Sequence, residues 1–263
     1  MIKFCSLFSG SSGNSLFLGF ESTRILIDAG LSAKKITQAL CSIGENPSEL
    51  SAILISHEHS DHIKGAGILS RRFNLPVYAN TSTWQSMESF IGPVQAHNKQ
   101  YFVSGEDFKI GSIAVRPFSI PHDASDPVGF NFFINGRKIT TATDIGHINR
   151  EILGYLEKSD MILLESNHDV EMLRVGPYPW HLKRRILGDR GHLSNDMAGK
   201  VVAYLASLGT RHFLLGHLSK ENNFPELAYE TVSNTLFEKK LAIGSDIYID
   251  VALRDRVSRV VEL

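Results

Sequence analysis

Short apolar runs rich in β-branched residues recur along the chain, and each of them predicts a buried β-strand. These runs cover residues 24–27, 52–56, 112–120, 129–135, 138–143, 161–165 and 212–216. Asn135-Gly136 joins two of the runs, and this pair is a strong signal for a two-residue β-hairpin turn. The pattern therefore predicts at least one antiparallel pair among strands that are otherwise separated by longer segments.

Between these runs, apolar residues recur at the spacing of an amphipathic helix. Ser32 is expected to cap a helix whose apolar face includes Ile36 and Leu40. A long helix is expected after Ser194, and another over about 225–240. Strands and helices alternate over residues 1–263 without a low-complexity linker or a repeat. This order predicts an α/β fold built of layers, in a single domain.

Several of the predicted strands end in a polar residue. The strand-end residues are Asp28, His57, Asp144, Glu165 and His217. Ligands of open α/β sheets gather at the carboxyl ends of the strands. We therefore expect these side chains to share one edge of the fold and to form one site.

The segment His57-Glu58-His59-Ser60-Asp61-His62 holds four candidate metal ligands in six residues. The two imidazoles of the H-x-H pair can hold one divalent ion, and Asp61 and His62 are placed to hold a second one. A solvated histidine-rich loop is the alternative. The downstream residues His122, Asp144 and His217 favour the metal site, although each alone would also fit a buried histidine or a turn aspartate.

Together these residues make seven nitrogen and oxygen ligands, a set that suits two ions such as Zn²⁺ or Mn²⁺, with Fe²⁺ also compatible. The ligands are His57, His59, Asp61, His62, His122, Asp144 and His217. Asp144 is the natural bridge because one carboxylate has two oxygens to share. The pattern of residue types thus predicts a binuclear hydrolytic centre.

The composition of the chain limits the classes of protein to which it can belong. The hydrophobic content of 43% is enough for a large core, and the net charge of −1 excludes a strongly basic nucleic-acid binder while allowing a local basic groove. The two cysteines provide no disulfide framework. No apolar run reaches the roughly 18 residues of a membrane span. We expect a cytoplasmic protein that does not enter a membrane.

The ordered ligands resemble the metallo-β-lactamase-fold hydrolases over nearly the whole chain. This resemblance implies a four-layer αβ/βα sandwich with the binuclear site on one edge. It implies that His57, His59, His122 and Asp144 hold the first metal, and that Asp61, His62, Asp144 and His217 hold the second. Asp28 matches a strand-end aspartate that hydrogen-bonds the ligand loop without touching metal.

Within this family the chain looks like the RNase Z-like phosphodiesterases and nucleases, and most like the YycJ (WalJ)-type bacterial subgroup. The distinctive stretches are residues 9–15, 165–169 and 190–195. Neither cysteine lies near a ligand position, which disfavours an antibiotic-hydrolysing enzyme. Only 73 residues separate Asp144 from His217 (217 minus 144), too few for a large inserted cap domain. The resemblance implies a DNA exonuclease with a role in DNA repair.

Further residues are assigned to catalysis and to substrate. Asp61 would orient the nucleophile, and His192 matches the non-ligand histidine that protonates the leaving oxygen in the RNase Z-like enzymes. A role for His192 in packing near the Ser194 cap is the alternative. The residues expected to contact substrate are Ser11, Ser12, Asn14, Asn167, His168 and Arg185.

The first three of these substrate residues lie in a Ser/Gly loop that could cradle phosphate or be a plain turn. Arg185 belongs to the basic run 183–185, which with Arg190 could neutralise a nucleic-acid backbone or be a solvated helix face. Two other functions stay open: hydrolysis of a small cyclic phosphodiester or lactone, and a metal-free scaffold. A basic run at the mouth of the site would favour nucleic acid, and intact ligands disfavour the scaffold.

Overall fold

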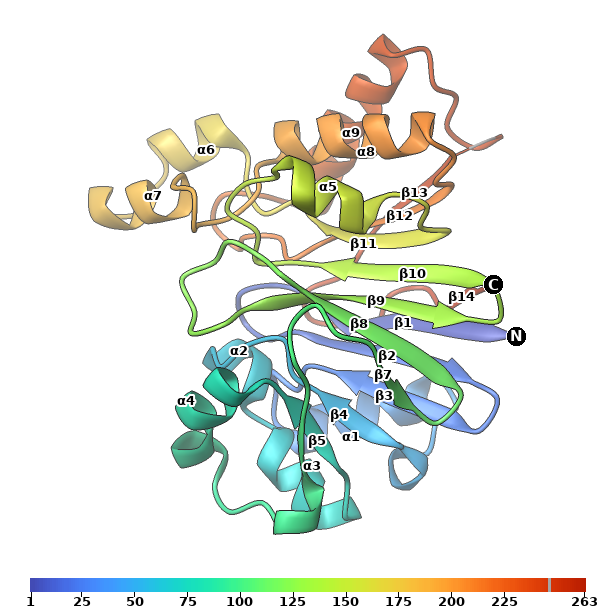
Figure 1. Ribbon diagram of the computed structural model, residues 1–263. Coiled ribbons are helices and arrows are strands. Elements are labelled where there is room, and N and C mark those ends of the chain that lie inside the picture. Colours follow the sequence, from blue (N-terminus) through green and yellow to red (C-terminus); the bar gives the residue numbers. More distant parts are fainter. Residues whose placement is uncertain (246) are drawn as a thin grey trace.

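The computed structural model describes residues 1–245 and 247–263. Two seven-stranded sheets lie face to face, and helices cover the outer face of each (Figure 1). The first sheet has the order β14 (Val261–Glu262), β1 (Ile2–Phe8), β2 (Ser15–Phe20), β3 (Thr23–Ile27), β4 (Ala52–Leu54), β5 (Val77–Ala79), β6 (Lys99–Tyr101). The second has the order β13 (Tyr248–Val251), β12 (His212–Gly216), β11 (Met161–Glu165), β10 (Arg137–Ala142), β9 (Val128–Ile134), β8 (Ile113–Ser119), β7 (Phe108–Ile110).

The longer helices cover the outer faces of the two sheets. The connections between β3 and β6 of the first sheet contain α1 (Ala33–Ser42), α2 (Ser60–Ile63), α3 (Ala66–Phe73) and α4 (Thr81–Ile91). The second half adds α5 (Arg150–Leu156), α6 (Val170–Val175), α7 (Trp180–Ile186), α8 (Asn195–Ser207) and α9 (Pro225–Glu238). These layers are the αβ/βα sandwich that the sequence predicts.

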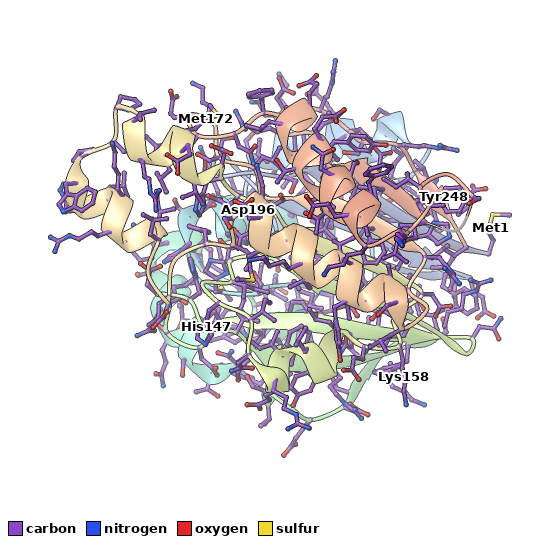
Figure 2. The ribbon with its side chains drawn as sticks, turned by 90° about the horizontal axis from the view of Figure 1, so that it is seen from above. Met1, His147, Lys158, Met172, Asp196 and Tyr248 are labelled. Carbon is purple, nitrogen blue, oxygen red and sulfur yellow. The ribbon has the colours of Figure 1, made fainter. Side chains whose placement is uncertain are left out.

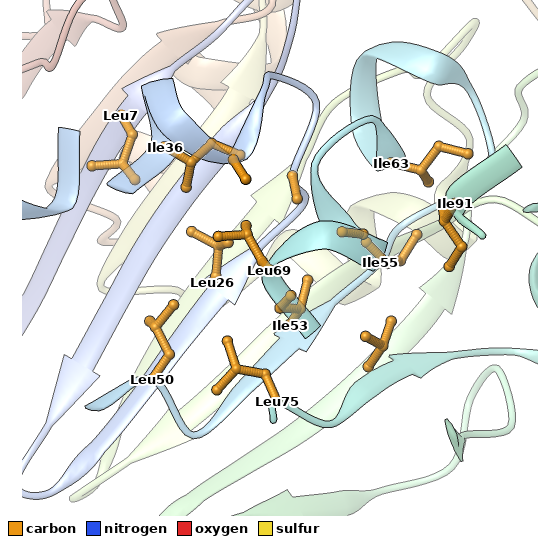
Figure 3. Close-up of a cluster of buried hydrophobic side chains, with 14 of the residues drawn as sticks. Leu7, Leu26, Ile36, Leu50, Ile53, Ile55, Ile63, Leu69, Leu75 and Ile91 are labelled. Atoms are coloured by element: carbon orange, nitrogen blue, oxygen red, sulfur yellow. The ribbon is translucent and has the colours of Figure 1, made fainter. Parts of the chain in front are cut away.

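The two-residue period of the strands explains the layers. In β3, Ile25 and Ile27 point into the core between the sheets, whereas Leu26 points into the core under the helices. In β11, Met161 and Leu163 face the partner sheet, and Ile162 and Leu164 belong to the core that includes residues of α8 and α9. Strands buried on both faces read as continuous apolar runs. Figure 3 shows the helix-side core of the first sheet, where Leu26 and Ile53 meet Ile36 and Leu69.

Most predicted elements lie within one or two residues of their expected bounds. Ser32 and Ser194 cap α1 and α8, because each hydroxyl accepts a hydrogen bond from a backbone N–H in the first turn. Asn135 and Gly136, both with positive φ, make the tight turn between β9 and β10. Within the described parts of the chain, no helix is long and apolar enough to span a membrane.

In each sheet, antiparallel pairing changes to parallel pairing near the middle. The run β3 to β6 is parallel, and so is the run β10 to β13. The carboxyl ends of these parallel strands lie at one edge of the sandwich. At the same edge, α6 and α7 stand out from the body (Figure 1).

Candidate metal centre

The polar residues that end the parallel strands come together at this edge. Asp28 follows β3, Asp144 follows β10 and His217 follows β12. All three adopt the left-handed backbone conformation, with φ of 58°, 60° and 57° respectively. This region is sparsely populated by residues other than glycine, and such strain is concentrated at functional sites. The chain turns sharply after each strand and thereby directs a polar side chain towards the shared site.

Three imidazoles form the first group of ligand atoms. His57 Nε2 lies 3.1 Å from His59 Nδ1, which lies 3.4 Å from His122 Nε2. Burial, the largest cause, lowers the pKa of His57 and of His59, and neighbouring imidazoles lower both pKa values further. Neutral imidazoles are the form that binds a metal ion. The group therefore has both the geometry and the protonation state of a metal site.

The second group surrounds Asp144. Asp144 Oδ1 lies 3.3 Å from His217 Nε2 and 3.7 Å from His122 Nε2, whereas Oδ2 lies 3.4 Å from His62 Nε2. Asp61 Oδ2 completes the group at 3.6 Å from the same His62 nitrogen. The carboxylate of Asp144 thus lies between the two groups, in the position that the sequence assigns to a bridging ligand.

The surroundings of one oxygen atom of Asp144 indicate that this arrangement fits a metal ion. Asp144 Oδ2 is buried and has no hydrogen-bond partner among the described residues. Burial opposes its ionisation, yet the imidazoles of His217 and His62 hold the pKa of Asp144 well below its usual range. A buried carboxylate without a hydrogen-bond donor is costly unless a cation compensates it. The donor set of imidazoles and carboxylates fits divalent metal ions.

Buried polar groups fix the orientation of the ligands. Asp28 Oδ2 lies 2.8 Å from His62 Nδ1 and accepts a hydrogen bond from the Ser56 hydroxyl at 2.8 Å. The same hydroxyl lies 3.0 Å from His57 Nδ1. His122 Nδ1 lies 3.2 Å from the carbonyl oxygen of Gly191. Each contact leaves the second ring nitrogen, Nε2, for the metal ion.

Asn14, expected to contact substrate, is buried among the ligands. Its Oδ1 lies 3.2 Å from His217 Nδ1, and its Nδ2 donates to Asp61 Oδ2 at 3.3 Å. The residue is 6% exposed, so its side chain holds the ligands Asp61 and His217 in position and is not open to substrate. Ser11 and Ser12 lie in the exposed turn that precedes it.

His192 lies beside the ligands and is paired with a buried carboxylate. Its Nδ1 is 2.8 Å from Glu165 Oε1 and 3.9 Å from Asp144 Oδ1. Glu165 is itself fixed, because Oε2 accepts hydrogen bonds from the backbone N–H groups of Ile145 and Leu193. Burial alone would lower the pKa of His192, but Glu165 outweighs it and raises that pKa to about 9.

A cavity of about 160 Å³ adjoins the metal centre. His192 forms part of its wall, and three of the expected substrate residues, Ser11, Asn167 and Arg185, line it as well. Ser219 adds a further hydroxyl. Ser12 is not part of the lining. The sixth expected residue, His168, is 1% exposed, and its ring nitrogens have no hydrogen-bond partner within the described residues.

The basic run divides into residues with different surroundings. Arg185 pairs with Asp123 at the rim of the cavity. Lys183 is buried and donates to the carbonyl oxygen of Arg174, whereas Arg184 is exposed. Arg190 donates two hydrogen bonds, at 3.0 and 2.8 Å, to the carbonyl oxygen of His122 and so supports a ligand loop. Only Arg185 of this run therefore lines the cavity beside the metal centre.

Several residues of the site received no role from the sequence. Those that contact the ligands, His192 or Arg185 include Ser56, Asp123 and Glu165. Ser56 directly precedes the ligand His57, and Asp123 directly follows the ligand His122. Adjacency to a ligand is therefore the signal in the sequence that could have identified them. Glu165 is visible as a strand-end carboxylate, but its partner His192 lies 27 residues away.

Comparison with known proteins identifies the family. The model of the beta-lactamase superfamily domain matches residues 23–218, which include all seven proposed metal ligands. The chain belongs to this superfamily. Zn²⁺-bound PqqB from Methylobacterium extorquens shares the fold, with a TM-score of 0.71 and 17% identity, covering 99% of this chain and 100% of PqqB.

Two curated relatives are similar over most of their length. Exodeoxyribonuclease WalJ from Streptococcus pneumoniae is 42% identical over 263 residues, which is 99% of this chain and 98% of WalJ. Exodeoxyribonuclease YycJ from Bacillus anthracis is 45% identical over 244 residues, or 92% of each chain. These relatives bear out the predicted resemblance to this subgroup of metal-dependent hydrolases.

Proposed function

We propose that this protein is a metal-dependent exodeoxyribonuclease that uses two divalent ions, Zn²⁺ or Mn²⁺. The observation that carries the proposal is the identity of 42% and 45% to two exodeoxyribonucleases over nearly the full chain. The geometry supports it, because six of the seven proposed ligands form compact groups that could hold a metal ion, and Asp61 lies beside His62. Catalysis would use the seven residues already described as ligands.

The proposed chemistry divides between the ions and the side chains. Divalent ions bound by these ligands would lower the pKa of a water molecule and polarise the phosphoryl group. Asp61 would orient the attacking water through its carboxylate. His192 would donate the proton that the leaving oxygen needs, since its raised pKa of about 9 keeps it protonated at neutral pH. Glu165 would hold the His192 ring in place through Nδ1.

The cavity favours a polymer over a small molecule as substrate. Pockets that enclose small ligands are typically about 300–1,000 Å³. The cavity beside His192 measures about 160 Å³ and has room for only one small group of a larger substrate. A scaffold without metal is disfavoured because no ligand position is substituted.

The decisive experiment measures nuclease activity of the purified protein with Mn²⁺ and Zn²⁺ separately. Substrates are end-labelled duplex DNA, single-stranded DNA, RNA and a closed circular duplex. We expect stepwise loss of nucleotides from linear DNA and no cleavage of the circle. Asp144→Ala should abolish this activity, whereas Asp107→Ala, at a surface ion pair, should retain it. Hydrolysis of a small cyclic phosphodiester with all polymers left intact would overturn the assignment.

We infer a cytoplasmic location and a role in DNA repair as the setting of this activity. Both follow from the resemblance to the YycJ (WalJ)-type subgroup and from the expected DNA substrate. Deletion of the gene should increase sensitivity to DNA damage, and a copy encoding Asp144→Ala should fail to restore resistance. Fractionation of the cells would test the location independently.

A further inference from the structure

The segment formed by α6 and α7 projects beyond the edge that holds the metal centre. Figure 1 shows it standing out from the sheets, and Figure 2 shows α6, with the labelled Met172, on the same side of the molecule when seen from above. The segment is fixed at its base. Leu173 has no exposed surface, and Lys183 Nζ donates to the carbonyl oxygen of Arg174 at 2.7 Å, which ties α7 to α6.

The connection between the two helices is stiff. Pro177 and Pro179 lie in the four residues that join α6 to α7, and proline fixes the backbone φ angle. On the other side, Arg185 of α7 is paired with Asp123, which follows the ligand His122. The position of α7 relative to the metal centre is therefore set by the proline-containing connection before it and by the Arg185–Asp123 pair near its C-terminal end.

The two faces of α7 have different surroundings. Leu182, Arg185 and Ile186 are three and four residues apart, so they share one face, and all three line the cavity beside His192. Trp180 and Arg184 are four residues apart and lie on the opposite face. The face of α7 that lines the cavity is its inner face, and the face with Trp180 and Arg184 is its outer face.

The outer face carries an exposed aromatic ring next to a cation. Trp180 is 64% exposed, whereas the other tryptophan, Trp84, is 2% exposed. Arg184 is exposed and forms no ion pair within the part of the chain that the structure describes. An exposed tryptophan beside a free arginine is a surface on which a nucleobase can stack while the arginine contacts phosphate.

We propose that α7 separates the two strands at the end of a DNA duplex, a proposal that rests on the nuclease function. The end of the strand to be cleaved lies at the inner face of α7, with one small group in the cavity beside the metal centre. The terminal base of the complementary strand stacks on Trp180, and its backbone lies near Arg184. Stacking on an aromatic side chain is comparable in strength to one base-pair step of DNA, so it offsets the opening of the terminal pair.

The test compares rates of hydrolysis on two substrates: a blunt duplex, and its labelled strand alone. Trp180→Ala should reduce the rate on the blunt duplex by about 10-fold and leave the rate on the single strand unchanged. Trp180→Phe should retain most of the duplex rate because the ring is kept. Phe237→Ala is the matched control, since this aromatic residue of α9 is 83% exposed and should affect neither substrate.

An equal loss on both substrates would overturn strand separation while leaving the nuclease function intact. A change in the oligomeric state of Trp180→Ala would overturn it too, because the outer face would then be an interface between copies. A wild-type protein that cleaves neither substrate would overturn the nuclease function itself. A second measurement uses the metal-free Trp84→Phe variant, in which Trp180 is the remaining tryptophan and the DNA is not cleaved. Linear duplex DNA should quench the fluorescence of Trp180, and closed circular duplex DNA should not.

Discussion

His192 Nδ1 lies 2.8 Å from Oε1 of Glu165, a carboxylate that has no exposed surface. The pair directs the opposite nitrogen of the ring, Nε2, towards the substrate side. Because Glu165 also accepts two backbone N–H bonds from the loops after β10 and before α8, it joins His192 to two segments of the site. The carboxylate therefore sets both the position and the charge of the imidazole.

This relationship predicts that the Glu165 charge matters for catalysis more than for metal binding. His192→Ala should lower the rate of DNA hydrolysis by about 10²–10⁴-fold, the usual contribution of a general acid. Glu165→Gln should lower it in the same direction, because the neutral amide no longer supports the protonated ring. Metal content, measured by elemental analysis, should stay at the wild-type level in both Glu165→Gln and His192→Ala. Loss of metal in His192→Ala would instead make His192 a ligand.

Asp144 provides a second prediction, about metal content. Its carboxylate contacts His62 and His217 and approaches His122, so Asp144→Asn should weaken both groups of ligands. Asp61 Oδ2 lies 3.6 Å from His62 Nε2, in the second group, so Asp61→Asn should weaken mainly that group. We expect two ions per wild-type chain, fewer in Asp61→Asn and fewest in Asp144→Asn by elemental analysis. Equal metal content in the two variants would contradict a bridging role.

The sequence predicts these ligands because each lies at or near the end of a strand whose apolar pattern is easy to recognise. The period of two residues divides the side chains of β3 and β11 between two apolar cores, and the polar residue at the end of each strand does not belong to either core. The place of Asp144 at a strand end follows from that pattern, whereas the direction of its side chain depends on the left-handed turn after β10.

Roles that depend on contacts between distant segments could not be predicted in this way. Asn14 contacts His217 across 203 residues of sequence, and a Ser/Gly loop gives no sign of which group it will meet. Arg190 lies in a basic run, yet its guanidinium is used on the backbone of His122, 68 residues away. A charge in sequence shows that a side chain is polar, and only the packing shows whether it faces a ligand loop or solvent.

Asp28 provides a third prediction, about metal affinity without direct coordination. Its two oxygens accept from the backbone N–H and the hydroxyl of Ser56, and one of them lies 2.8 Å from His62 Nδ1. Asn tolerates the left-handed conformation at this position, but its amide nitrogen cannot accept these bonds. Asp28→Asn should therefore weaken metal binding by about 10- to 100-fold. Chelator competition would measure the Kd, and an unchanged Kd would exclude this supporting role.

His168 provides the last prediction, which concerns stability and pH. The side chain is 1% exposed, and burial lowers its pKa from 6.5 to about 4. Between these two pH values the unfolded chain binds a proton that the folded chain does not. Stability should therefore decrease as the pH falls from 6.5 towards 4, with a total loss of roughly 3 kcal/mol from this one group.

The measurement is thermal unfolding of the metal-free protein across this pH range, since metal release would otherwise add its own pH dependence. His168→Leu fills a similar volume and has no titrating group, so its unfolding temperature should decrease less between pH 6.5 and 4 than that of the wild type. The control is His181→Leu, at an exposed position of α7, which should keep the wild-type slope. Because the other buried histidines are common to all three proteins, the difference in slope isolates His168. Parallel curves for the wild type and His168→Leu would mean that the pKa of His168 is not lowered in the folded chain.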